Sequence, residues 1–295
     1  MNATRAATWA GVAAIVLWSS LALLTVATGP LPPFQVLAIG FGIAGVSGTL
    51  LTALRGRAGW RQWRVPPASL ALTIAGLFGY HALYFFSLKR APAVEANLIN
   101  YLWPLLIVLF SALLPGVRLR AGNILGALLG FAAAALLIAA GTSTTTGDGA
   151  LPGYLAAFLA ATTWAGYSVL NRRFADTPGS AIVPACLAVA LLGALAHLGL
   201  ERTVAPSNGQ WIALLVMGLG PVGVAFRLWD RGTRHGDLAL LGSLSYLAPL
   251  LSTLLLVAAG RAQPRWTQAV AVVLLTAGAW LSMRASATPR SDALP

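Results

Sequence analysis

The chain has 295 residues, of which 58% are hydrophobic and 9% are charged, and its formal net charge is +12 at pH 7. Soluble domains carry about 25% charged residues, so this composition excludes a water-soluble globular fold. It predicts instead a chain whose apolar segments lie in a lipid bilayer.

Ten apolar segments follow one another along the chain, each of about 20 residues, the length at which a helix crosses a bilayer. They are 8–28, 34–54, 68–88, 93–114, 122–141, 151–171, 180–200, 209–229, 237–259 and 265–284. We therefore predict an all-α membrane protein with ten transmembrane helices. The loops between them are short, which leaves no room for a soluble catalytic or nucleotide-binding domain.

The basic residues are distributed unequally between the two sides of the predicted membrane. Most of the 19 Lys and Arg residues fall on the side that holds both ends of the chain. The opposite side holds Lys89, Arg90, Arg202, Arg261 and Arg265. This asymmetry follows the positive-inside rule and places both termini in the cytoplasm. The basic loops are expected to meet anionic lipid head groups rather than nucleic acid, because they do not form one basic face with interleaved aromatics.

A six-residue motif occurs twice, about half a chain apart. Tyr101–Leu106 reads Tyr-Leu-Trp-Pro-Leu-Leu, and Tyr246–Leu251 reads Tyr-Leu-Ala-Pro-Leu-Leu. Each half has five predicted crossings, and an odd number turns the second copy upside down relative to the first. We predict an inverted repeat with a first five-helix unit at 1–141, a linker at 142–150 and a second unit at 151–284. The small, polar tail at 285–295 is expected to be disordered.

Each copy of the motif carries a proline deep in its segment, Pro104 and Pro249. Proline has no N–H, so the carbonyls of Asn100 and Ser245 are expected to lose their helical partners. Broken helices placed symmetrically around a central cavity mark the binding sites of many transporters. We expect the two carbonyls to line such a cavity and to accept hydrogen bonds from substrate. The alternative is a pair of kinks that neighbouring helices repair.

Polar and aromatic side chains inside the predicted segments are the candidate substrate contacts. They are Trp18, His81, Tyr84, Asn97, Asn100, Tyr101, Trp103, Trp164, Tyr167, Ser168, Ser245 and Tyr246. Amides within a membrane require partners, which a ligand or a neighbouring helix could supply. For His81, a hydrogen-bonded position in the cavity wall is favoured over a proton relay.

The predicted mid-membrane regions carry no acidic residue, Lys or Arg. Arg227 lies about one turn from the cytoplasmic edge, where it could snorkel or pair with Asp230. A neutral cavity disfavours phosphorylated substrates and favours a zwitterion with an apolar or aromatic group. The sequence has no metal-ligand spacing, nucleotide-binding loop or catalytic motif, so we expect no metal, no cofactor and no enzymatic activity.

The segment Ser87–Leu105 (Ser-Leu-Lys-Arg-Ala-Pro-Ala-Val-Glu-Ala-Asn-Leu-Ile-Asn-Tyr-Leu-Trp-Pro-Leu) resembles the drug/metabolite transporter superfamily, EamA type, as do Trp18-Ser19 and the five-plus-five layout. Within that superfamily, Asn97–Pro104 is similar to the aromatic amino acid exporter branch. The resemblance implies ten helices in an inverted repeat and a central cavity. It also implies alternating access and export of amino acids across the bacterial inner membrane.

Two alternatives to amino acid export stay open at this point. One is a broad-specificity efflux carrier for drugs or metabolites, and the other is a channel or small-molecule sensor. The second half has Ala248 where the first has Trp103, so unequal contributions to substrate contacts are expected. The sequence leaves the oligomeric state open, a monomer included.

Overall fold

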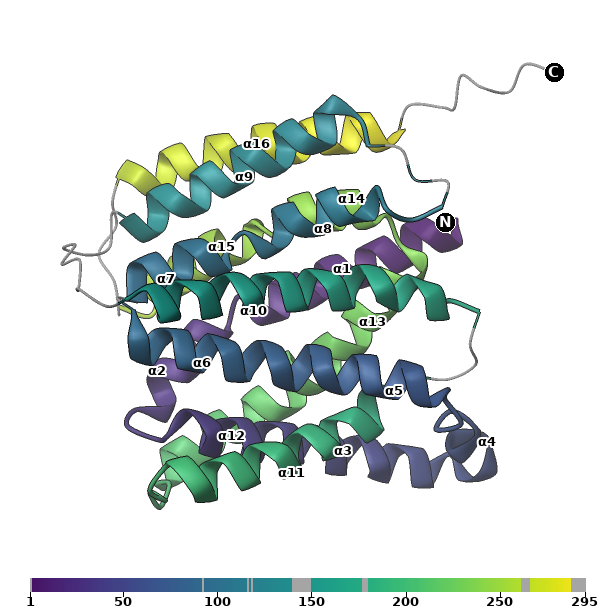
Figure 1. The fold of residues 1–295 in the computed structure, drawn as a ribbon, viewed down its shortest axis with the longest axis vertical. Coiled ribbons are helices and arrows are strands. Elements are labelled where there is room, and N and C mark those ends of the chain that lie inside the picture. The colour runs from purple at the N-terminus through teal and green to yellow at the C-terminus, as the bar shows by residue number, and fades with distance from the viewer. Residues whose placement is uncertain are drawn as a thin grey trace.

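The computed structural model describes residues 2–91, 93–115, 117, 119–139, 150–176, 180–260 and 266–287. Within these ranges every regular element is a helix. The start of α1 (Ala3–Trp18) and the end of α16 (Trp266–Ala287) lie at the same end of a stack of helices (Figure 1). We call this the terminal end and the opposite one the far end. Of the predicted linker and tail, residues 142–149 and 288–295 lie outside the described residues.

Short interruptions divide the long helices into the remaining elements. In the first half these are α2 (Leu21–Thr28), α3 (Pro33–Leu54), α4 (Gly56–Arg61), α5 (Pro67–Ile74), η1 (Ala75–Gly79), α6 (Tyr80–Arg90), α7 (Ala93–Asn100), α8 (Trp103–Ser111) and α9 (Ala121–Ala139). In the second half they are α10 (Leu151–Leu170), η2 (Asn171–Phe174), α11 (Ile182–Leu200), α12 (Asn208–Met217), η3 (Gly218–Val224), α13 (Ala225–His235), α14 (Leu238–Leu244) and α15 (Leu247–Ala258).

Seven helices of the described residues are long and apolar enough to cross a membrane, judged by length and composition. They cover Ala3–Thr28, Pro33–Leu54, Pro67–Arg90, Ile182–Leu200, Asn208–His235, Leu238–Ala258 and Trp266–Ala285. The other predicted segments form α7 with α8, α9 and α10. These pack among the seven, since α9 contacts α16 and α10 contacts α6. The chain is therefore a multi-pass helical membrane protein.

The first apolar segment forms one membrane-length helix that is interrupted within its length. It breaks between Trp18 and Leu21, at two consecutive serines. Ser19 Oγ donates to the carbonyl of Ile15 at 2.9 Å, and Ser20 Oγ donates to that of Leu17 at 2.7 Å. Such side-chain bonds compete with the helical ladder and bend it.

Two widened π-helical turns occupy corresponding places in the two halves. The first is η1, between α5 and α6, and the second is η3, between α12 and α13. In η3, Pro221 removes one backbone N–H from the ladder, and a wider turn accommodates that loss. In η1, Gly76 lies so close to Tyr167 that an added Cβ would be 2.5 Å from the ring. Each π turn therefore coincides with a residue that limits regular α-helical packing, Pro221 in η3 and Gly76 in η1.

The helix that follows η3 is longer than predicted. The sequence-based boundary at 229 is wrong, because α13 continues to His235. The extra turns contain buried Asp230, Thr233 and Arg234. Their side chains bond to one another and to η2, which lets polar residues continue a buried helix.

Helices of the two halves pack against one another in pairs. The helix α3 contacts α11, α8 contacts α14, and α9 contacts α16. Likewise α1 packs on α13, while α10 packs on α6. Figure 1 shows the same pairing, with α9 beside α16 at one edge of the stack and α3 beside α11 at the other. The space between these edges holds the cavity described next.

Candidate functional site: a central aromatic cavity

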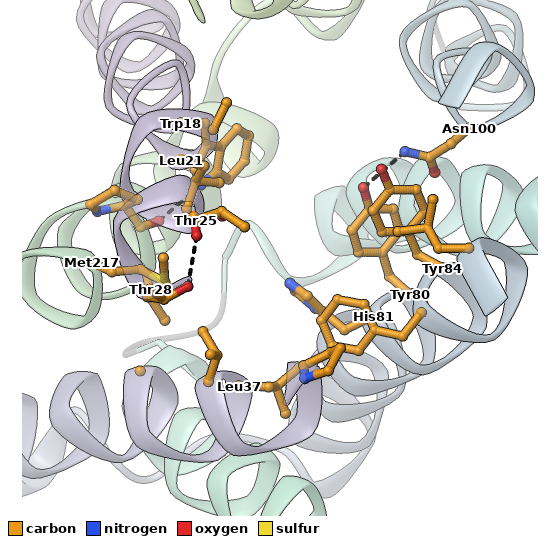
Figure 2. Close-up of a pocket in the computed structure, with 18 of the residues that line it drawn as sticks. Trp18, Leu21, Thr25, Thr28, Leu37, Tyr80, His81, Tyr84, Asn100 and Met217 are labelled. Atoms are coloured by element: carbon orange, nitrogen blue, oxygen red, sulfur yellow. Dashed lines mark hydrogen bonds between the residues drawn. The ribbon is translucent and has the colours of Figure 1, made fainter. Parts of the chain in front are cut away.

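A cavity of about 650 Å³ lies between helices of both halves, a volume typical of small-molecule sites. Most of its lining comes from the first half and from Trp164, and the remainder from α12, η3, α13 and α15. It extends from the buried Trp164 to Gly29 and Leu31, which join α2 to α3 at the far end. Figure 2 shows aromatic and amide side chains on one wall, and Trp18 with the threonines of α2 on the opposite wall.

Two tyrosine–asparagine pairs form the polar part of the wall. Tyr84 donates its hydroxyl hydrogen to Oδ1 of Asn97. Asn100 donates from Nδ2 to the Tyr80 hydroxyl at 3.1 Å, as Figure 2 shows. The Oδ1 atom of Asn100 is buried and has no hydrogen-bond partner among the described residues. The two phenol rings stack at 5.9 Å with an interplanar angle of 10°. The wall thus presents flat aromatic faces beside amide groups.

His81 has one ring nitrogen committed to the backbone. Its Nδ1 lies 2.6 Å from the carbonyl oxygen of Leu77, within η1. A carbonyl only accepts hydrogen bonds, so Nδ1 carries the proton. In the neutral ring Nε2 is then an acceptor. The widened turn of η1 therefore fixes which tautomer the cavity meets.

The inner end of the cavity is closed by a cluster of aromatic rings. Trp18 packs edge-on against Trp164 at 5.5 Å and lies 5.1 Å from Trp229. Its indole N–H donates to the carbonyl of Pro221 in η3 at 2.9 Å. Trp103 contacts both other indoles, at 6.3 and 6.0 Å. The cluster joins α1, α8, α10 and α13 at the inner end of the cavity, and we call it the aromatic floor.

A buried polar network lies beside this floor, toward the terminal end. Oδ1 of Asp230 accepts from Nε of Arg234 at 2.9 Å and from Nδ2 of Asn171 at 3.0 Å. Nη1 of Arg234 donates to the carbonyl of Phe174 at 3.1 Å. Asp230 is 5% exposed and Arg234 is 3% exposed. The sequence left Arg227 as a partner for Asp230, but Arg234 takes that place because it lies one helical turn along the same face.

Eight predicted site residues come together on the cavity wall. They are Trp18, His81, Tyr84, Asn97, Asn100, Tyr101, Trp103 and Trp164. No charged residue is found among the described residues that line the cavity. Their assignment as substrate contacts stays a prediction.

Four predicted residues lie outside the described lining. Tyr167 is buried against Gly76, and Tyr246 is buried against Gly130. Ser168 accepts from the Trp229 indole N–H at 3.1 Å, and Ser245 donates to the carbonyl of Leu241 at 2.7 Å. These side chains serve helix packing in this conformation.

The prolines lie where helices restart rather than on the cavity wall. The helix α8 begins one residue before Pro104, and α15 begins two residues before Pro249. The expectation of a free Ser245 carbonyl is wrong, because the N–H of Ala248 donates to it at 3.1 Å. A tighter turn supplies the partner that proline cannot, and Ser245 is fully buried.

Several lining residues were not singled out by the sequence. Thr25 and Thr28 come from α2, which bends into the cavity only because the helix breaks at Ser19 and Ser20. Phe41 and Phe226 stack at 5.5 Å across the two halves. Apolar residues of this kind occur throughout the chain, so composition offers no signal that separates them from lipid-facing residues.

A helical membrane protein with a closed-floored, aromatic cavity between two halves belongs to the class of small-molecule transporters. Comparison with known families agrees with this. The sequence pattern of the EamA-like transporter family matches residues 4–139 and again residues 151–284. The chain belongs to this family, which confirms the resemblance seen in its sequence.

Individual relatives are similar over most of their length. The aromatic amino acid exporter YddG of Ancylobacter novellus is 49% identical over 277 residues, covering 92% of this chain and 95% of that protein. The YddG exporter of Salmonella typhimurium is 27% identical and covers 95% of this chain and 99% of its own length. A solved crystal structure, 47% identical, superposes with a TM-score of 0.90 over 95% of this chain and 97% of that one.

Proposed function

We propose that the chain is a secondary transporter that exports aromatic and other neutral amino acids across the bacterial cytoplasmic membrane. The observation that carries this proposal is a cavity of about 650 Å³ with aromatic and amide walls and no charged residue in its described lining. A zwitterion brings equal opposite charges, so a neutral site can hold it without an unpaired charge. The names of the relatives support aromatic amino acids as the substrate class.

The wall offers partners for each part of such a substrate. The ammonium group meets the Nε2 acceptor of His81 and the faces of the stacked tyrosines, and a turn of the Asn100 amide would bring its buried, unpartnered Oδ1 to the same group. The indole cluster around Trp164 accommodates an aromatic side group by offset or edge-on stacking. The carboxylate is bound by hydroxyl and amide donors that turn from their present partners. We therefore propose transport without an enzymatic role, which the match to a transporter family supports.

Transport would proceed by alternating access of this one cavity. The cavity reaches the far end, while the aromatic floor and the Asp230–Arg234 network close the terminal end. Rocking of one half against the other would open the terminal end and close the far one. The variant Ser252→Cys in a Cys186→Ala background tests whether the cavity opens at the far end, because Ser252 lines the cavity. We expect an impermeant maleimide to label it from outside, and tryptophan to slow the labelling.

The proposed architecture is ten membrane crossings in two inverted repeats, at 1–141 and 151–284, joined by a linker at 142–150 and followed by a tail at 285–295. Both termini lie in the cytoplasm. Three observations support it: the family pattern matches each half, the π turns recur in corresponding places, and the described ends lie at one end of the stack (Figure 1). In a Cys186→Ala background, the variants Arg5→Cys and Arg202→Cys should react with an impermeant maleimide from opposite sides of the membrane.

Counterflow in liposomes tests the function. Vesicles loaded with unlabelled tryptophan should accumulate labelled tryptophan and phenylalanine, with labelled glutamate and lysine left outside. Asn100→Ala and Trp164→Ala should reduce the rate more than Trp211→Ala, because Trp211 is 47% exposed on the outer surface of the stack.

The same assay separates the alternatives. If tryptophan, phenylalanine, threonine and methionine all fail to exchange while cationic dyes do, the chain is an efflux carrier of another substrate class. Single-channel currents in planar bilayers would instead indicate a channel. Equal losses in the three variants would refute the cavity as the binding site.

A further inference from the structure

A second, smaller cavity of about 260 Å³ lies at the terminal end and shares no lining residue with the central one. It is formed by the last turns of α3, the loop after α4, the start of α11 and the first turns of α13. Figure 1 shows α3, α4 and α11 together at one edge of the stack. None of its lining residues is a proposed substrate contact of the central cavity.

Three guanidinium groups line this second cavity, those of Arg55, Arg227 and Arg231. None of the three forms an ion pair or hydrogen bond within the part of the chain that the structure describes. Asp230 also lines the cavity, but the buried Arg234 already matches its charge. The cavity therefore has an excess of positive charge.

The position of Arg227 is built into the helix packing. Its Nη2 lies 2.3 Å from where a Cβ on Gly48 would be, so the guanidinium packs against the backbone of α3 and a methyl group at Gly48 would displace it. Arg231 follows four residues later on the same face of α13, and like charges at that spacing repel. Arg227 is half-buried whereas Arg231 is exposed, so the charge of Arg227 is partly desolvated and a bound anion would compensate it.

Neighbouring groups give the cavity a fixed shape and further donors. The Trp63 indole N–H donates to Oγ1 of Thr52 at 3.1 Å, and the N–H of Ser180 donates to the carbonyl of Gln62 at 3.3 Å. These bonds hold the loop after α4 against α3 and α11. The side-chain amide of Gln62 and the hydroxyl of Ser180 can both donate into the cavity.

We propose that this cavity binds a phosphate-type oxyanion, held by Arg227 with Arg55 and Arg231. Arginine binds phosphate through two parallel charge-assisted hydrogen bonds, and several such groups neutralise its charge. The cavity lies at the end where the basic loops of the chain gather, so its ligand is either the phosphate of an anionic lipid or a soluble phosphate. Both present the same chemistry to the three guanidiniums.

The test compares the wild-type protein with Arg227→Gln, Gly48→Ala and the control Arg57→Gln. Arg57 is exposed in the same basic stretch but does not line the cavity. One arm measures thermal stabilisation in lipid-free detergent by inorganic phosphate against chloride at equal ionic strength. The other measures retention of phosphatidylglycerol against phosphatidylcholine by native mass spectrometry.

We expect Arg227→Gln to weaken the apparent affinity at least tenfold, which corresponds to about 1.4 kcal/mol. Gly48→Ala should weaken it as well, and Arg57→Gln should stay within about twofold of wild type. Phosphate stabilisation in the first arm would identify a soluble ligand, and retention in the second arm alone would identify a lipid. Failure of both probes to bind, or equal losses in Arg227→Gln and Arg57→Gln, would overturn the proposal. Central-cavity counterflow is measured separately, so neither result depends on the other.

Discussion

The Asp230–Arg234 pair gives the sharpest test of how a buried ion pair contributes to the stability of this fold. In Asp230→Ala the Arg234 guanidinium remains buried without its carboxylate, and the Asn171 amide loses one of its two acceptors, the other being the Thr233 hydroxyl. Both charged residues are nearly inaccessible, so solvent screening offers little relief. Removing one partner of a buried ion pair costs about 3–5 kcal/mol.

Replacing both partners should cost much less. In the double variant Asp230→Ala/Arg234→Met no charge stays buried, and an apolar side chain fills the space beside α10 and η2. At about 2 °C per kcal/mol, Asp230→Ala should lower the melting temperature by roughly 6–10 °C, and the double variant should recover most of that loss.

The melting temperature is best measured in detergent from the fluorescence of the ten tryptophans. Arg57→Met serves as the control, because its side chain is exposed and lies outside the network. If the single and double variants have the same melting temperature, the unpaired charge of Arg234 is not what destabilises Asp230→Ala. An unchanged melting temperature in Asp230→Ala would show that the ion pair does not stabilise the fold.

Three further predictions concern other contacts. Gly130→Ala should lower the melting temperature, with a cost of about 1–3 kcal/mol, because an added Cβ would lie 2.3 Å from the buried ring of Tyr246. Glu201→Ala should lower the free energy of unfolding by about 0.5–2 kcal/mol, because the Glu201 carboxylate accepts from the first N–H groups of α3 at 3.1–3.2 Å. The measurement is the melting temperature, and an unchanged melting temperature would show that the cap does not stabilise the fold. Trp18→Phe should raise the KM of tryptophan counterflow and lower the free energy of unfolding by about 0.5–1.5 kcal/mol, because its indole hydrogen bond to η3 is lost. Wild-type counterflow in this variant would contradict the place of Trp18 in the site.

The sequence was most informative where one residue type has one physical consequence. The low charged fraction required a membrane environment, and the motif from Ser87 to Leu105 led to the family that the comparisons confirm. The prolines marked places where helices restart, since proline cannot complete the ladder. Eight of the residues chosen as polar or aromatic outliers within apolar segments line one cavity.

It was less informative where several partners compete for one group. Ser245 was expected to present a free carbonyl, but the local turn brings the N–H of Ala248 to it. Asp230 has Arg227 three residues before it and Arg234 four residues after it, and only the packing of α13 on η2 selects Arg234 as its partner. Tyr167 and Tyr246 carry the same hydroxyl as Tyr84, yet each is buried against a glycine of another helix.

The sequence by itself determined that the chain lies in a membrane, which family it belongs to and that the predicted mid-membrane regions carry no acidic residue, Lys or Arg. These conclusions follow from residue types and motifs along the chain. Only the tertiary structure decided which face of each helix meets the cavity. It placed Thr25 and Thr28 on the wall through the break at Ser19, and it set the tautomer of His81 through the turn at Leu77. The physical reason is that every group in the membrane must find a partner within the protein, and several geometries satisfy any one segment alone. The choice among them depends on contacts between residues far apart in the chain.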